Sequence, residues 1–130
     1  MYRTLLHGKI HRATVTNANI DYVGSITIDS TLLQAAGIYP YERVQVADVD
    51  NGERLETYVI AGPANSGAIE LNGAAARLIH TGDKVIIMAY GQVADPVPED
   101  WAPKVVIVDR ANRIAEIRQA EAPGEMLGIR

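Results

Sequence analysis

VQVADVDNGERLETYVI, residues 44–60, carries the clearest fold signal in the chain. Asn51-Gly52 stands between two runs of residues with high strand propensity, and this dipeptide suits the positive φ angles of a two-residue hairpin turn. The stretch therefore predicts two antiparallel strands, residues 44–50 and 53–60.

Further segments on both sides of this hairpin are rich in β-branched residues and bounded by turn-forming residues, which is typical of short strands. They are residues 5–16, 20–28, 68–71, 84–90 and 104–109. About seven short strands with little helix predict a mainly β fold, and in particular a small closed β-barrel, because closure leaves no exposed strand edge. All 130 residues fit one domain of this kind.

Two short helical pieces interrupt the strands. Residues 31–36 predict a helix with Asp29 or Ser30 as its N-cap and Gly37 as its stop. An alanine-rich turn over residues 73–79 predicts a second helical piece.

The C-terminal part of the chain predicts less regular structure. Pro96, Pro98 and Pro103 indicate an irregular covering segment from Asp95 onward. Residues 111–130 are charged and interrupted by proline and glycine, so a short helix followed by a frayed end is expected there.

The composition excludes several classes of protein. The chain has no cysteine, so disulfides, thiolate nucleophiles and Cys-ligated zinc are ruled out. The net charge is −4 and the 12 basic residues are scattered, which argues against nucleic acid binding. No apolar run has the length of a signal peptide or a membrane span. A cytoplasmic protein is expected, with neither nucleic acid nor membrane as its partner.

Gly24-Ser25 lies inside the predicted strand 20–28 and allows two interpretations. In the structural one, a glycine inside a strand marks a bulge or a close backbone approach. In the chemical one, the serine hydroxyl attacks the Gly24 carbonyl and converts the amide to an ester. β-Elimination and hydrolysis with loss of ammonia then turn Ser25 into a pyruvoyl group. Glycine suits this reaction because it tolerates strained backbone angles and leaves the carbonyl accessible.

Polar residues on the second strand of the hairpin are also open to two interpretations. Alternation puts Arg54 and Tyr58 on one face and Thr57 on the other, unless a bulge intervenes. These residues are either ordinary strand side chains at a barrel rim or groups that bind a ligand.

The Asn72-Gly73 pair begins either a plain helix or a helix N-terminus whose free N–H groups bind an anion. The histidines show no convincing metal-ligand spacing, since four residues of strand separate His7 and His11 by roughly 13 Å. No metal site is predicted.

Together, five segments resemble the bacterial aspartate 1-decarboxylase family. They are RTLLHGKIHR (3–12), YVGSITID (22–29), NGERLETY (51–58), LNGAAA (71–76) and GDKVII (82–87). The resemblance covers roughly residues 1–109, and five segments in the correct order are far more specific than one motif. It favours the chemical interpretation of the Gly-Ser bond and a binding role for the polar strand and turn residues.

The resemblance implies a six- to seven-stranded double-psi β-barrel that assembles as a homotetramer with active sites at subunit interfaces. It implies self-cleavage into a β chain, 1–24, and an α chain, 25–130, either spontaneously or with a maturation helper. The implied reaction converts L-aspartate to β-alanine and CO₂ for pantothenate and coenzyme A synthesis. A pyruvoyl cofactor is implied, with neither pyridoxal phosphate nor a metal.

The resemblance also assigns the reacting residues. Cleavage falls between Gly24 and Ser25, and the ketone made from Ser25 condenses with the substrate amine to act as the electron sink. Tyr58 matches the proton donor that quenches the carbanion after CO₂ leaves. Thr57 matches a residue that assists self-processing and is placed among the substrate-binding groups.

The remaining assignments concern binding. Arg54 and Lys9 match groups that hold the two carboxylates of the substrate, with Lys9 reaching across a subunit interface. The backbone amides of Gly73, Ala74 and Ala75 match substrate-binding positions. Asn72, Tyr22 and His11 support the site or the interface.

Two other functions stay open at this stage. The first is an unprocessed, non-catalytic barrel that serves as a binding or assembly module, with Ser25 intact. The second keeps the pyruvoyl enzyme but changes its substrate to another small acidic amino acid. Fold alone excludes neither, because one fold hosts many functions.

Overall fold

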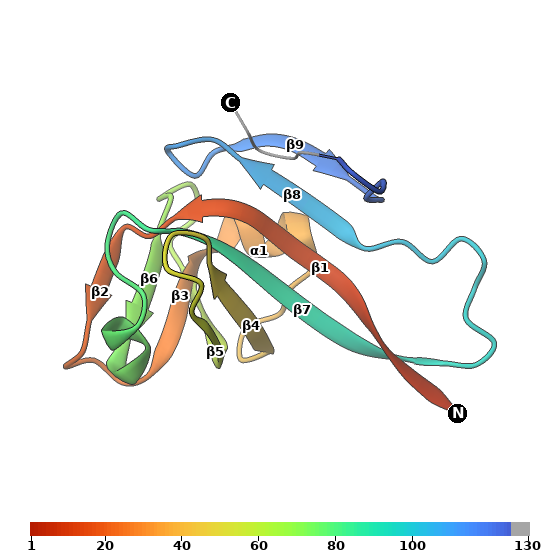
Figure 1. Cartoon of the computed structure of the whole chain (residues 1–130), viewed down its shortest axis with the longest axis horizontal. Coiled ribbons are helices and arrows are strands. Elements are labelled where there is room, and N and C mark those ends of the chain that lie inside the picture. Colours follow the sequence, from red (N-terminus) through yellow and green to blue (C-terminus); the bar gives the residue numbers. More distant parts are fainter. Residues whose placement is uncertain (126–130) are drawn as a thin grey trace.

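The computed structural model describes residues 1–125, and most of its regular structure is strand (Figure 1). The elements are β1 (Tyr2–Thr14), β2 (Asn17–Asn19), β3 (Ser25–Asp29), α1 (Ser30–Ala36), β4 (Arg43–Asp48), β5 (Arg54–Gly62), β6 (Ile69–Asn72), the 3₁₀ helix η1 (Gly73–Arg77), β7 (Lys84–Ala94), β8 (Lys104–Val108) and β9 (Ile114–Arg118). The strands form one nine-stranded sheet in the order β2-β6-β3-β5-β4-β7-β1-β8-β9. The mainly β prediction is confirmed, and closure of the sheet into a barrel stays a prediction.

The hairpin predicted from residues 44–60 is present as β4 and β5. These strands pair antiparallel, with Val46 opposite Leu55. The predicted two-residue turn is wrong: residues 49–53 connect the strands, and Gly52 has a positive φ of +79° whereas Asn51 does not have a positive φ. The carboxylate of Asp48 accepts hydrogen bonds from the backbone N–H groups of Asp50 and Asn51 at 2.8 and 3.2 Å. The Asn51-Gly52 dipeptide thus predicted the β4–β5 hairpin.

The predicted strand 20–28 is wrong in its first half. Residues 20–24 form a turn and a bend, and β3 begins only at Ser25. The side chain of Asn19 accepts a hydrogen bond from the Asp21 N–H at 2.9 Å, and this local bond turns the chain away from an extended path. Gly24 therefore precedes a strand and does not mark a bulge inside one.

The first predicted helix is confirmed as α1, and Asp29 is its N-cap. The Asp29 carboxylate accepts backbone N–H groups from Thr31 at 2.8 Å, Asn65 at 3.0 Å and Gly67 at 2.9 Å. Burial alone would raise the pKa of Asp29, but these hydrogen bonds outweigh it and hold the pKa below its ordinary value. The helix ends at Gly37, which has a left-handed φ of +70°.

The core consists mainly of isoleucine, valine and leucine side chains from the inward faces of the strands and of α1. The helix packs against β1 at Gly8, where an added Cβ would lie 2.4 Å from the backbone oxygen of Ala36. Only glycine permits this approach of helix to strand.

The C-terminal part differs from its prediction. The segment from Asp95 to Pro103 is irregular, as predicted, and Figure 1 shows it at the same end of the molecule as the N-terminus. The short helix expected after residue 111 is wrong: β9 pairs antiparallel with β8 instead. Asp109 accepts the Arg113 N–H at 2.9 Å and Asn112 has a φ of +59°, so a tight turn returns the chain along the free edge of β8. The predicted frayed end falls partly on residues 126–130, which lie outside the described residues.

Within the described part of the chain, no helix has the length and apolar character needed to cross a membrane.

Candidate active site

Two strand ladders bring the predicted site residues to Ser25. In the antiparallel pair β3·β6, Ser25 lies opposite Asn72. In the parallel pair β3·β5, Ile26 lies beside Val59. Counting back along both parallel strands places Tyr58 beside Ser25 and Thr57 beside Gly24. The neighbourhood predicted from three separate motifs is therefore created by one strand, β3, that pairs on both sides.

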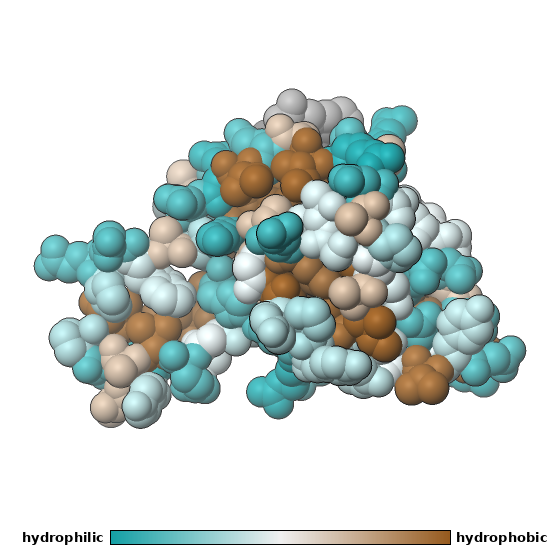
Figure 2. All heavy atoms as spheres, turned by 180° about the vertical axis from the view of Figure 1, so that it is seen from behind, coloured by the Kyte–Doolittle hydropathy of each residue, from teal (hydrophilic) through white to brown (hydrophobic). Residues whose placement is uncertain are grey.

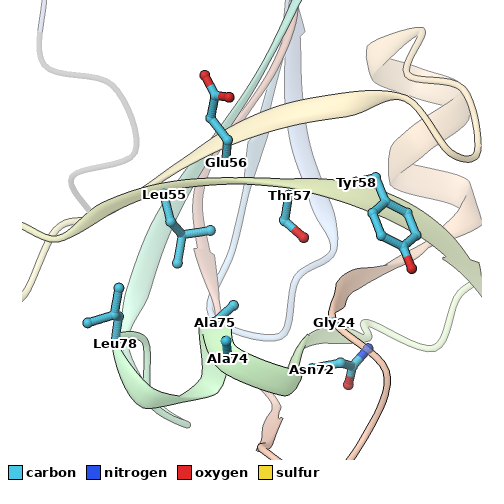
Figure 3. A pocket seen from close by; sticks show the side chains of 9 residues that line it. All are labelled: Gly24, Leu55, Glu56, Thr57, Tyr58, Asn72, Ala74, Ala75 and Leu78. Carbon is cyan, nitrogen blue, oxygen red and sulfur yellow. The ribbon is translucent and has the colours of Figure 1, made fainter.

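A cavity of about 400 Å³ opens beside the Gly24–Ser25 peptide. Its lining residues come from the segment before β3, from β5, from the end of β6 and from η1: Gly24, Leu55, Glu56, Thr57, Tyr58, Asn72, Ala74, Ala75 and Leu78. Figure 3 shows the side chains of Leu55, Thr57 and Tyr58 extending from β5 toward Gly24 and Ala74, with the Glu56 carboxylate on the opposite side of the strand.

Ser25 is fully buried, with 0% of its surface exposed. Asn72 Nδ2 donates a hydrogen bond to Ser25 Oγ at 3.1 Å, and Ser25 Oγ lies 3.4 Å from the Val23 carbonyl oxygen to which it donates. Asn72 Nδ2 also donates to Thr27 Oγ1 at 3.1 Å. Asn72 Oδ1 is buried and has no hydrogen-bond partner among the described residues. The serine hydroxyl thus donates to one backbone carbonyl and accepts from one oriented amide in a buried position beside the cavity.

Gly73 packs directly against the peptide that precedes Ser25. An added Cβ at Gly73 would lie 2.7 Å from Gly24 Cα, 2.9 Å from Gly24 N and 3.0 Å from the Tyr22 carbonyl oxygen. Gly73 also has a left-handed φ of +68°. Both observations require glycine at this position, and its contact fixes the backbone of Gly24.

The two predicted carboxylate-binding cations do not line this cavity. Arg54 lies on β5 but donates from Nη2 to the side-chain oxygen of Gln45 at 3.1 Å. Lys9 lies on β1, which is separated from β5 in the sheet by β4 and β7. Its Nζ forms an ion pair with the Glu121 carboxylate at 2.7 Å. Among the described residues, no lysine or arginine lines the cavity.

The other predicted residues divide between the cavity and its surroundings. Thr57 and Tyr58 both line the cavity although the strand register is unbroken and alternation assigns them to opposite faces. Tyr58 stacks on Tyr41, with ring centroids 6.4 Å apart. Tyr22 is 57% exposed and contributes only its backbone near Gly73, while His11 lies on β1 opposite Ile107.

Sequence reasoning missed four residues at this site. Leu55, Glu56 and Leu78 line the cavity, and Thr27 holds Asn72. The two-residue period of a strand would have found Leu55 from Thr57 and Thr27 from Ser25. The sequence contains no comparable signal for Leu78, whose backbone oxygen accepts a hydrogen bond from the side-chain amide of Asn51 at 2.8 Å.

Sequence reasoning also missed a group of carboxylates at the hairpin turn. Oxygen atoms of Asp48, Asp50 and Asp83 lie within 4.8 Å of one another. Burial, together with the neighbouring Asp83, raises the pKa of Asp48, and the hydrogen bond with Asp48 lowers the pKa of Asp83. The ionised form is therefore disfavoured at Asp48 and favoured at Asp83.

Comparison with known proteins gives a consistent result. The family model for aspartate decarboxylase matches residues 1–115. A relative named aspartate 1-decarboxylase from Carboxydothermus hydrogenoformans is 58% identical over 96% of this chain and 98% of its own. Relatives of the same name from Acaryochloris marina and Neisseria meningitidis are 60% and 56% identical, over 89% and 98% of this chain and 88% and 100% of theirs. A computationally designed protein, msDPBB_sym2, is similar in structure at a TM-score of 0.42 and 16% identity, over 67% of this chain and 99% of its own.

The family match extends past residue 109, where the resemblance of individual segments ended, to residue 115. The family model spans most of the chain and the relatives are similar along nearly their whole lengths. The chain belongs to the aspartate decarboxylase family.

Proposed function

We propose that the protein cleaves itself between Gly24 and Ser25 and then decarboxylates L-aspartate to β-alanine with a pyruvoyl group made from Ser25. Membership of the family supports aspartate decarboxylation. The observation that carries the self-cleavage is the Ser25 hydroxyl, which is fully buried beside a cavity and held at 3.1 Å by Asn72.

The residues around position 25 fit a small ketone. Asn72 Nδ2 would donate to an oxygen there, and the unpaired Asn72 Oδ1 leaves an acceptor for a further donor. Because Gly73 has no side chain, its backbone can lie close to the backbone of Gly24. The pyruvoyl group would supply the electron sink that loss of an α-carboxylate requires.

Two side chains on β5 have roles that follow from their positions. Tyr58 lines the cavity and lies beside Ser25 in the strand register, so its phenol is placed to donate a proton to the substrate carbon after CO₂ leaves. Thr57 lies beside Gly24, where its hydroxyl is placed to stabilise the oxyanion that forms when Ser25 attacks the Gly24 carbonyl. Figure 3 shows both side chains on the Gly24 side of β5.

The missing cations favour assembly. A dicarboxylate needs positive partners, and none lines the cavity within the described part of this chain. Lys9 and Arg54 do not line the cavity of their own chain, and another copy of the chain that brought such cations to the cavity would supply the missing partners. This supports the homotetramer with sites at subunit interfaces.

The surface is consistent with such assembly. Figure 2 shows apolar side chains gathered in patches between polar ones on the face seen from behind. Large apolar or aromatic side chains that are exposed near the site include Tyr22, Val23, Ile60 and Leu78. We place the enzyme in the cytoplasm, where its β-alanine would feed pantothenate synthesis, and cleavage is either spontaneous or assisted by a helper protein.

Intact-mass measurement under denaturing conditions, before and after warming, tests the proposal. Two species are expected, residues 1–24 and residues 25–130 with pyruvoyl at the new N-terminus. Ser25→Ala is the control and stays one chain. A wild-type chain that stays intact even with cell extract present would overturn the proposal in favour of a binding module.

The reaction itself is tested with the cleaved protein. β-Alanine should form from L-aspartate faster than the decarboxylation product forms from L-glutamate, and the reverse preference would change the proposed substrate. Tyr58→Phe should self-cleave at the wild-type rate but lose most of its decarboxylation turnover, because the substitution removes only the proton donor. Equal turnover in Tyr58→Phe and wild type would remove Tyr58 from the mechanism.

A further inference from the structure

We propose that Thr27 is a positioning residue for self-cleavage: its hydroxyl fixes the Asn72 amide, which in turn holds and stabilises Ser25 Oγ. The inference rests on the proposed self-cleavage, and neither the resemblance of individual segments nor the lining of the cavity assigns a role to Thr27.

The contacts of the Asn72 amide carry the argument. Nδ2 donates at 3.1 Å to Ser25 Oγ and at 3.1 Å to Thr27 Oγ1. Oδ1 has no partner among the described residues, so it does nothing to orient the amide. Ser25 Oγ moves during the reaction, because its bonds are made and broken. Thr27 Oγ1 is therefore the one stationary partner of the amide within the described chain.

The position of Thr27 is itself determined by the fold. Thr27 follows Ser25 by two residues on β3, so the two side chains lie on the same face of the strand. On the β5 side, an added Cβ at Gly62 would lie 3.1 Å from Thr27 Cγ2. The Thr27 methyl group thus fills the space that the missing side chain of Gly62 leaves. With the methyl group placed there, the hydroxyl is directed to Asn72, and a β-branched residue has few other rotamers.

The chemistry explains why the amide must be held. Ser25 Oγ adds to the Gly24 carbonyl carbon, the C–N bond breaks, and the nitrogen takes the hydroxyl proton, which gives an ester. When water takes the Ser25 Cα proton, the Cβ–Oγ bond breaks and its electron pair stays on Oγ, which leaves as part of the Gly24 carboxylate. Negative charge therefore builds on Oγ, and an N–H aimed at Oγ stabilises that charge only if its direction is fixed in advance.

The test is the rate of self-cleavage after cell-free synthesis, followed by denaturing intact mass, in Thr27→Val and Thr27→Ser. Valine keeps the shape but removes the acceptor, so cleavage should slow by about tenfold, the effect of one buried hydrogen bond. Serine keeps the hydroxyl but loses the methyl group that directs it, so Thr27→Ser should self-cleave faster than Thr27→Val and more slowly than wild type. Thr4→Val is the matched control, because it removes a bond of the same kind, from Gln92 Nε2 to Thr4 Oγ1 at 2.9 Å, away from this cavity. It should cut at the wild-type rate.

Three results would overturn the inference: Thr27→Val cutting as fast as wild type, Thr27→Ser slowing as much as Thr27→Val, or Thr4→Val slowing equally. If Thr27→Val does not fold, as judged by its circular dichroism and melting transition, Thr27→Ala replaces it with the same expectation. Failure of the proposed function is distinguishable, because then the wild type and every variant stay uncut.

Discussion

Gly73→Ala tests how closely the Gly24 backbone must be held. The new Cβ would lie 2.7 Å from Gly24 Cα, whereas ordinary contacts of a Cβ begin at 3.4 Å. The Gly24 segment must therefore retreat by 0.7 Å, the difference between these two distances. Alanine at a φ of +68° adds backbone strain of about 1–2 kcal/mol.

The displacement acts on the reacting carbonyl. A misplacement of about 1 Å can cost roughly 100-fold in a reaction that depends on close approach of two groups, so self-cleavage should slow by about 10- to 100-fold. The melting temperature should fall as well, because the strain and the contact both act on the folded state.

Gly52→Ala separates the two effects. Gly52 has a similar φ of +79°, but an added Cβ would have no neighbour within 4 Å. It should lower the melting temperature by the strain alone and leave the cleavage rate unchanged. Cleavage is followed by denaturing intact mass, and stability by thermal unfolding of chains that also carry Ser25→Ala. Wild-type cleavage in Gly73→Ala, or an equal loss of rate in Gly52→Ala, would refute the idea that this contact positions Gly24.

Three further substitutions test charges in the structure. The lowered pKa of Asp29 contributes stability that is fully present above the ordinary value of 3.8 and is lost as the pH falls through the folded-state pKa. Both carboxylate oxygens of Asp29 accept backbone N–H groups, and asparagine has only one acceptor oxygen. Asp29→Asn should therefore cost about 1–2 kcal/mol at pH 7 in urea unfolding, with the difference shrinking below pH 3.8. The raised pKa of Asp48 contributes stability below 3.8 that is lost as the pH rises through the folded-state pKa. Asp48→Asn should therefore stabilise by about 1 kcal/mol at pH 7 and have no effect in acid, and a loss of stability at pH 7 would contradict an unfavourable charge at this buried position beside Asp83. Glu121→Gln removes the partner of Lys9 in a partly exposed ion pair, which is worth up to about 1 kcal/mol. The KM for aspartate should therefore fall by up to about fivefold, with kcat unchanged. An unchanged KM would show that Lys9 binds no substrate carboxylate.

The fold was predictable wherever local chemistry determined the backbone. Asn51-Gly52 identified the hairpin, and Asp29 with Gly37 identified both ends of α1. Prediction of secondary structure failed where a tertiary contact or a single side-chain hydrogen bond determined the path of the backbone. The turn after Asn19 depends on one Asx hydrogen bond inside a run of strand-forming residues. β9 forms because β8 offers a free edge, which no local pattern in residues 111–130 reveals.

The sequence predicted some of the residues that meet beside the cavity but not their geometry, and the roles of these residues stay predictions. Resemblance to a family identified Ser25, Thr57, Tyr58 and Asn72, and the two ladders of β3 explain why they meet. Thr27 was missed because its role depends on strand pairing, which sequence alone does not give.

Cleavage at Gly24 would leave the fold intact, because the segment before the cut is held by pairing that does not involve the broken bond. β1 pairs antiparallel with β7 and parallel with β8, and β2 pairs with β6. The segment after the cut begins directly with β3, which keeps its own ladders to β5 and β6. Gly24 itself is exposed and lies in a bend, so the new chain end can separate from residue 25 without loss of a strand hydrogen bond. A break at the edge of β3 therefore frees the catalytic position from the preceding chain while both neighbouring strands continue to hold it.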